Sequence, residues 1–123
     1  MAVAADPRFM GVVAVLPVTD HAASVSWYTK WLGRGPDVVP AEGVAEWKLA
    51  GAAWLQVGLN PEAAGHTSVV VTVPDVSAQQ KACRDAGFEV GDIQDYGVVK
   101  IITLPDPDGN QVMFVEEVQA PPN

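Results

Sequence analysis

Several residue types on which particular classes of protein depend are scarce in this chain. Its 123 residues include a single cysteine, Cys83, which can form neither an internal disulfide nor a cysteine-based zinc site. Its apolar runs are far shorter than the ~20 residues that span a bilayer. Residues 1–10 lack the basic start and apolar stretch of a secretory signal. We therefore expect a cytoplasmic protein that does not enter a membrane.

Basic residues are scarce as well. Seven Lys and Arg residues stand against fifteen Asp and Glu residues, which gives a formal net charge of -8 at pH 7. This surplus repels nucleic acids and anionic lipids, so neither is expected as a partner. A neutral or cationic small molecule is compatible with the charge, and a role in solubility alone is an equal alternative.

Signatures of common catalytic sites are also missing. The sequence contains no Gly-rich phosphate loop, no G-x-S-x-G and no H-E-x-x-H. Asp106 and Asp108 lie two residues apart, but within a Pro-Asp-Pro-Asp-Gly turn we expect them to bond the local backbone. Cys83 lies on the apolar side of an expected helix, where a thiol is inert.

Apolar residues, by contrast, are abundant. A hydrophobic content of 49% and a mean hydropathy of +0.15 predict one folded domain over residues 1–123. Helices capped by Asp20 and Asp75 are expected over 21–32 and 76–86, each followed by a glycine. Strands are expected over 10–18, 44–49, 53–59, 68–73, 98–104 and 111–118.

The second half of the chain repeats the first at an offset of 55 residues, as from Val13 to Ser68 and from Asp20 to Asp75. Each half reads as a strand, a capped helix, and then two or three strands. Such a repeat indicates one supersecondary unit used twice. We therefore predict an α+β fold of two tandem β-α-β-β-β modules, over about residues 9–60 and 66–118, with a helix covering one face of each sheet.

Three groups of residues carry a resemblance to a known family. They are Val18-Thr-Asp20 with Ser24-Val-Ser-Trp-Tyr28 and Leu32-Gly33, then Val73-Pro-Asp-Val76, then Asp106-Pro-Asp-Gly-Asn110. In this order and spacing they resemble the vicinal oxygen chelate superfamily of glyoxalases, extradiol dioxygenases and bleomycin-resistance proteins. The pattern is most similar to the metal-free, bleomycin-resistance-like branch. The resemblance implies sheets that curl into a cup, with helices outside, and a homodimer.

The resemblance also implies four positions at which catalytic members hold a divalent metal. Three of them carry Val13, Ser68 and Met113 in this chain, and Gln56 is the candidate for the fourth. Valine has no lone pair, a thioether is soft, and serine is a poor ligand for a hard cation. His66 and Gln56 alone lack a convergent third ligand. The sequence therefore predicts neither a metal site nor a cofactor.

Alternation along the strands predicts which side chains line the cup. If Ser68 faces it, so does Thr72, while Val69 and Val71 pack under a helix. The alternative for the Trp and Met residues of the set is the core or a dimer interface. Trp47 is added as a neighbour of Trp54 on the preceding strand, and Tyr96 because it lies just before or within the strand that enters the 105–110 turn, with its direction left open. The predicted ligand site consists of Trp47, Trp54, Gln56, His66, Ser68, Thr72, Tyr96 and Met113.

Four functions remain open on this reading. The preferred one is a protein that binds and sequesters a small molecule, for example a cationic antibiotic, without chemistry. The alternatives are a metal-dependent enzyme of the glyoxalase or dioxygenase type, a metal-free enzyme that uses His66, Tyr96 or Lys100 as acid or base, and a structural or regulatory dimer. Whether the chain is an enzyme is thus left open.

Overall fold

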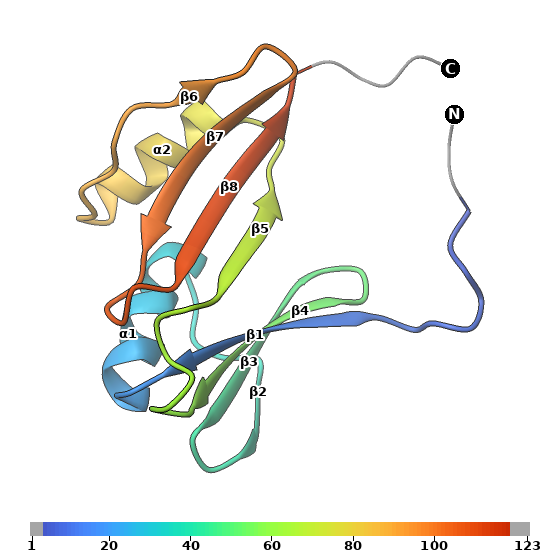
Figure 1. The fold of residues 1–123 in the computed structure, drawn as a ribbon, viewed down its shortest axis with the longest axis vertical. Coiled ribbons are helices and arrows are strands. Elements are labelled where there is room, and N and C mark those ends of the chain that lie inside the picture. The colour runs from blue at the N-terminus through green and yellow to red at the C-terminus, as the bar shows by residue number, and fades with distance from the viewer. Residues whose placement is uncertain (1–3, 119–123) are drawn as a thin grey trace.

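Two similar four-stranded sheets, each with one helix against it, make up the fold (Figure 1). The computed structural model describes residues 4–118. The first sheet has the order β1-β4-β3-β2 and the second the order β5-β8-β7-β6. The elements are β1 (Val12–Val18), α1 (His21–Leu32), β2 (Val38–Ala41), β3 (Val44–Ala50), β4 (Ala53–Leu59), β5 (Ser68–Thr72), α2 (Val76–Asp85), β6 (Gln94–Asp95), β7 (Val99–Pro105) and β8 (Gln111–Glu117).

The tandem β-α-β-β-β repeat is confirmed. In each sheet the first strand pairs in parallel with the last strand, β1 with β4 and β5 with β8, and the other strand pairs are antiparallel. Both first strands therefore lie at a sheet edge. Within residues 4–118, no helix has the length and apolar character that crossing a membrane requires.

Two short strands were not expected from the sequence. The stretch from Arg34 to Gly43 reads as a loop because of Pro36 and Pro40, yet it contains β2, which pairs only with β3. Proline is tolerated there because an edge strand needs hydrogen bonds on one side only. The two-residue β6 is too short to show any alternation.

Both helices begin and end as their caps predict. The Oδ1 atoms of Asp20 and Asp75 accept hydrogen bonds from the backbone N–H groups of Ala23 and Ala78, each at 3.1 Å. Gly33 ends α1 in the left-handed region, with a φ of 79°. The side chains of Asp20 and Asp75 satisfy amide groups that the first helical turn leaves free.

Aromatic side chains of α1 join the two modules. The ring of Trp31 packs edge-on against Phe114 of β8, with 5.1 Å between centroids, and Trp27 packs against Phe88 at 5.4 Å. Tyr28 lies fully buried between these tryptophans. Trp27 and Trp31 are therefore structural residues, partly buried and packed against the core.

The turn between β7 and β8 adds a polar connection between the modules. The buried carboxylate of Asp106 accepts hydrogen bonds from the backbone N–H groups of Asp108 and Asn110, as expected, and also from Tyr28 Oη at 2.8 Å. Asp108 accepts from the hydroxyl of Thr19 at 2.6 Å. The turn therefore connects the second module to Thr19, between β1 and α1, and to Tyr28 within α1.

The two faces of each sheet differ in burial. Leu16, Val18, Leu55 and Val57 of the first sheet are buried on the helix side, whereas Val13 and Val15 each leave 47% of their surface exposed. We call the opposite surfaces the open faces. That of the first sheet contains Val13, Val15, Glu46, Lys48, Trp54 and Gln56. That of the second sheet contains Ser68, Val70, Thr72, Ile101, Thr103, Met113 and Val115.

Candidate functional site

Trp54 and Gln56 lie on the open face of the first sheet, where the strand alternation of β4 places them. Both side chains are half-buried. Val13 is the register partner of Trp54 and Val15 that of Gln56 on the parallel strand β1. An indole ring, an amide and two valines therefore form a continuous surface that solvent reaches.

Trp47 does not belong to this surface, which corrects the expectation that it neighbours Trp54. It is 0% exposed, and its Nε1–H donates to the carbonyl of Arg34 at 3.0 Å. Its register partner on β4 is Leu55, and residues directly opposite each other in an antiparallel pair share a face. Because Leu55 points to the core, Trp47 does too.

Three of the predicted residues share the open face of the second sheet. Ser68 and Thr72 of β5 are exposed, and Met113 of β8 is half-buried. Val70, between Ser68 and Thr72 on this face, is the register partner of Met113. The surface again combines apolar side chains with hydroxyl groups.

His66 and Tyr96 lie outside the regular strands. His66 is exposed and precedes the first residue of β5, so the alternation used to predict its direction does not extend to it. Tyr96 is exposed in the turn after β6, where its hydroxyl donates to Gln94 Oε1 at 3.2 Å. Lys100 lies in β7 opposite Glu116, one residue out of phase with Ile101 and Thr103 of the open face.

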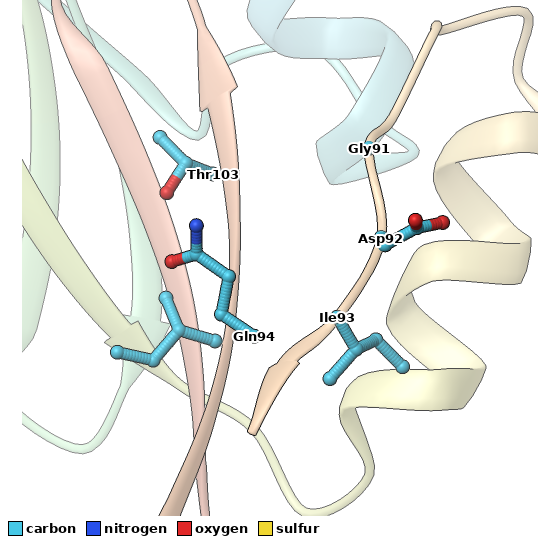
Figure 2. Close-up of a pocket in the computed structure, with 6 residues that line it drawn as sticks. Gly91, Asp92, Ile93, Gln94 and Thr103 are labelled. Carbon is cyan, nitrogen blue, oxygen red and sulfur yellow. The ribbon is translucent and has the colours of Figure 1, made fainter. Parts of the chain in front are cut away.

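A cavity of ≈ 300 Å³ lies beside the open face of the second sheet, between β7 and the chain segment that leads into β6. In Figure 2, the side chain of Ile93 points toward α2, whereas those of Gln94 and Thr103 point away from this helix. Sequence reasoning missed this cavity, although Ile101 and Thr103 alternate with the buried Ile102 and Leu104. The lining residues are Gly91, Asp92, Ile93, Gln94, Ile101 and Thr103.

A smaller cavity of ≈ 170 Å³ lies where the two modules meet. One side of it comes from the β3–β4 hairpin and the other from β5. Its lining is almost entirely aliphatic, and Ala53 precedes Trp54 of the first open face. The lining residues are Leu49, Ala50, Ala53, Val70, Val71 and Thr72.

Sequence reasoning also missed Glu46, the acidic residue of the first open face. It lies on β3 directly opposite Gln56, whose Nε2–H donates to Glu46 Oε2 at 2.7 Å. Both side chains are half-buried. Glu46 directly precedes Trp47 on β3, and successive strand residues point to opposite faces. Assigning Trp47 to the core would therefore have placed Glu46 on the open face.

The residues at the family's metal positions do not fit a divalent cation. Val13 and Met113 offer no hard donor, Ser68 is exposed at the start of β5, and the amide of Gln56 is engaged with Glu46. Over residues 4–118, no group of three or more His, Cys, Asp or Glu side chains converges as a metal site requires. The described residues therefore do not provide the ligands that a catalytic divalent metal needs.

The one thiol of the chain is unsuited to nucleophilic chemistry. Cys83 is buried in α2, and burial raises the pKa of its thiol, an effect that a hydrogen bond from Gln79 only partly opposes. A thiol with a raised pKa is a poorer source of thiolate. Cys83 therefore packs as part of the core.

Comparison with known proteins supports this description of the fold. A chain described as glyoxalase / bleomycin resistance protein, from Catenulispora acidiphila DSM 44928, has 31% sequence identity and a TM-score of 0.81, covering 88% of this chain and 98% of its own. A bleomycin-binding protein complexed with bleomycin has 18% identity and a TM-score of 0.71, covering 86% and 97%. A search of curated protein sequences gives no significant match.

A similar fold also occurs in an enzyme. Lactoylglutathione lyase from Agrobacterium tumefaciens has 16% identity and a TM-score of 0.71, covering 90% of this chain and 95% of its own. At these identities the likeness to the lyase and to the bleomycin-binding protein concerns the fold alone. The family model for the glyoxalase/bleomycin resistance protein/dioxygenase superfamily matches residues 11–114. The chain belongs to the glyoxalase/bleomycin resistance protein/dioxygenase superfamily.

Proposed function

We propose that this protein binds and sequesters a small molecule, neutral or cationic, on the open faces of its sheets, without metal chemistry. The observation that carries the proposal is the composition of these faces. They present Trp54, Met113, Val70 and hydroxyl groups to solvent, while Val13 and Met113 occupy positions where a metal enzyme of the family needs ligands. Surfaces that combine apolar side chains with a few polar groups suit ligand binding.

The predicted binding residues divide between the two sheets. Trp54 and Gln56 form the part on the first sheet, and Ser68, Thr72 and Met113 form the part on the second. An indole face stacks on flat or cationic groups, and a methionine side chain adapts to irregular shapes. His66 and Tyr96 lie at the margin of this site, and Trp47 supports it from the core.

The likeness to proteins whose names refer to antibiotic binding agrees with this proposal. One of the similar folds is seen with bleomycin bound, and another is described as an antibiotic binding protein from Streptomyces sp. CB03234. An antibiotic is accordingly the first ligand class to test. The net charge of -8 favours a cationic one.

We further propose that the protein acts as a homodimer, with a location in the cytoplasm. The edge strand β1 and the residues before it carry no charged side chain from Phe9 to Val18, and Phe9 and Met10 are 70% and 92% exposed. Long apolar edge strands without charges are rare on isolated proteins because they pair or aggregate. In Figure 1, residues 4–11 extend beyond the sheet, away from both helices. A second copy covers this segment.

The proposal is tested by thermal unfolding of chelator-treated protein with metal-free bleomycin in some samples and Mg²⁺, Mn²⁺, Ni²⁺ or Zn²⁺ in others. A ligand that binds only the folded state adds ~2.7 kcal/mol at about a hundred times its Kd. We expect bleomycin to raise the Tm, and Trp54→Ala and Met113→Ala to abolish the rise. Val98→Ala, an exposed position at the β6–β7 turn, is the control.

Stabilisation by a metal without any effect of bleomycin would contradict the proposal. That outcome would favour the enzymatic alternative, since the chain shares its fold with a lyase. His66 and Gln56 would then be the first residues to reconsider as ligands.

A further inference from the structure

The open face of the first sheet contains one carboxylate, Glu46, and one lysine, Lys48, which lies opposite Trp54. Glu46 lies opposite Gln56 across the β3–β4 pair, and the next residues across the sheet and along β4 are Val15 and Trp54. Because Glu46 is half-buried, its charge is only partly surrounded by water. A charge in such a place needs hydrogen bonds or an opposite charge.

The protein supplies a hydrogen bond but no opposite charge. Gln56 Nε2–H donates to Glu46 Oε2, and within residues 4–118 no protein group donates to Glu46 Oε1. The ion pairs of the described residues are Arg8–Asp6, Arg34–Asp37 and Lys81–Asp85, so none involves Glu46. Lys48 lies two residues along β3 on the same face, but it forms no ion pair with Glu46.

The orientation of the Gln56 amide adds a second acceptor. Since its nitrogen donates to Glu46, its Oε1 is turned the other way and lies 3.7 Å from the position that a Cβ would occupy on Gly58. The absence of a side chain at Gly58 leaves this oxygen uncovered on that side. The same open face thus carries two acceptor oxygens without a donor among the described residues, Glu46 Oε1 and Gln56 Oε1, of which the second points toward Gly58.

We infer that Glu46, held by Gln56, is the residue that selects a ligand with a protonated nitrogen, such as an ammonium or amidinium group. The carboxylate accepts a charge-assisted hydrogen bond from that nitrogen, which is stronger than one between neutral groups. The neighbouring indole of Trp54 provides a flat surface for the rest of the ligand and attracts the cation to its face. This inference rests on the proposed binding function and specifies its ligand class.

The test uses two probes of the same shape, 1-naphthylmethylamine with an ammonium group and 1-naphthalenemethanol with a neutral hydroxyl, together with metal-free bleomycin, in calorimetric titrations of the full chain. We expect the amine to bind wild-type protein more tightly than the alcohol. Glu46→Gln keeps the size and the hydrogen bond to Gln56 but removes the charge, so it should weaken amine binding by about tenfold or more. Alcohol binding should stay unchanged.

Glu42→Gln is the matched control, because Glu42 is exposed in the β2–β3 turn. It changes the net charge equally and should leave amine binding as it is. If Glu46→Gln does not fold, the salt dependence of wild-type binding replaces it. Amine affinity should then fall between 20 and 500 mM NaCl, because salt screens exposed charge interactions, whereas alcohol affinity should not.

Three outcomes overturn the inference, and they differ in what else they affect. Equal binding of the amine by wild type and Glu46→Gln refutes the role of Glu46 and leaves the binding function intact. An equal loss of amine and alcohol affinity in Glu46→Gln shows that Glu46 shapes the site without distinguishing charged from neutral ligands. Failure of all three probes to bind wild-type protein contradicts the proposed function itself, and the inference falls with it.

Discussion

At the scale of single residues, the buried pair of Tyr28 and Asp106 is the most consequential polar contact. Tyr28 Oη donates to Asp106 Oδ2 at 2.8 Å, and Asn110 Nδ2–H donates to the same oxygen at 2.8 Å. Burial raises the pKa of the Tyr28 hydroxyl, and the charge of Asp106 raises it further. The phenol therefore keeps its proton in the folded protein at pH values at which an unfolded tyrosine loses it.

Tyr28→Phe tests this contact through its pH dependence. At pH 8 we expect the variant to lose about 1.5–3 kcal/mol in the free energy of unfolding, the range for hydrogen bonds to charged groups. An unfolded tyrosine ionises near pH 10, so above that pH the unfolded wild-type chain is favoured and wild-type stability falls. The difference between the proteins should shrink by about 1.4 kcal/mol by pH 11.

Urea unfolding at pH 8, 10 and 11 measures this difference directly. Subtracting the variant from the wild type removes the contribution of lysines and other groups that titrate in both proteins. A difference that stays constant, or grows, between pH 8 and 11 would contradict the raised pKa of Tyr28.

Truncation of the two tryptophans of one hairpin, Trp47 and Trp54, is expected to lower the free energy of unfolding by very different amounts. Trp47 is fully buried and hydrogen-bonded, so Trp47→Ala should lower the free energy of unfolding by about 3–5 kcal/mol. Trp54 is half-buried on the open face, so Trp54→Ala should cost much less and mainly reduce ligand binding. Chemical denaturation of both variants checks this, and similar losses would mean that Trp54 belongs to the core.

At the scale of elements, the β7–β8 turn connects three separate parts of the chain. Asn110 Nδ2–H donates to the carbonyl of Pro17 in β1 at 2.7 Å, and Asn110 Oδ1 accepts from the backbone N–H groups of Gly65 and Thr67 at 3.0 and 3.1 Å. Gly65 is required next to it, because a Cβ there would lie 2.5 Å from the carbonyl oxygen of Asp108. One buried amide thus fixes the linker between the modules.

Asn110→Ala should therefore destabilise the fold more than an ordinary loop substitution. It leaves two backbone N–H groups and one carbonyl without their partner, which we expect to cost about 3 kcal/mol or more. Asn60→Ala, at an exposed asparagine of the same linker, is the matched control and should change stability little. Equal losses in thermal unfolding of the two variants would show that the turn does not hold the modules together.

Local patterns were sufficient to predict most elements, but contacts between distant elements were not predictable. Asp20, Asp75 and Gly33 predict where helices begin or end, because capping depends on neighbouring residues only. The face of Trp47 depends instead on the β3–β4 register, which places it opposite the buried Leu55. The expectation that Trp47 neighbours Trp54 rested on its place in the preceding strand without that register, and the pairing contradicts it.

The same limit explains what was missed in the candidate site. Alternation placed Ser68, Thr72 and Met113 on one face because β5 and β8 pair without irregularity. The cavity beside β7 depends on how the segment from Gly91 to Ile93 departs from the sheet, and β6 is too short to reveal that in sequence. The pairing of Glu46 with Gln56 likewise requires the hairpin register.

At the scale of the whole molecule, the uncharged edge of β1 predicts self-association. Val12→Lys places a charge on this edge at a side chain that is 71% exposed, so the monomer should tolerate it. We expect light scattering after gel filtration to give twice the chain mass for wild type and the single-chain mass for Val12→Lys. Val98→Lys, at a side chain that is 59% exposed, should remain dimeric. A monomeric wild type would refute the dimer.

The most direct test of the binding proposal is a nuclear magnetic resonance titration of chelator-treated protein with metal-free bleomycin, followed at the indole N–H signals and the Met113 methyl group. We expect saturable shifts of the Trp54 and Met113 signals, with those of Trp31 and Trp47 little changed. A parallel titration with Mn²⁺ should broaden no signal selectively. Unmoved Trp54 and Met113 signals, or Mn²⁺ broadening centred on Gln56 and His66, would contradict binding on the open faces without a metal.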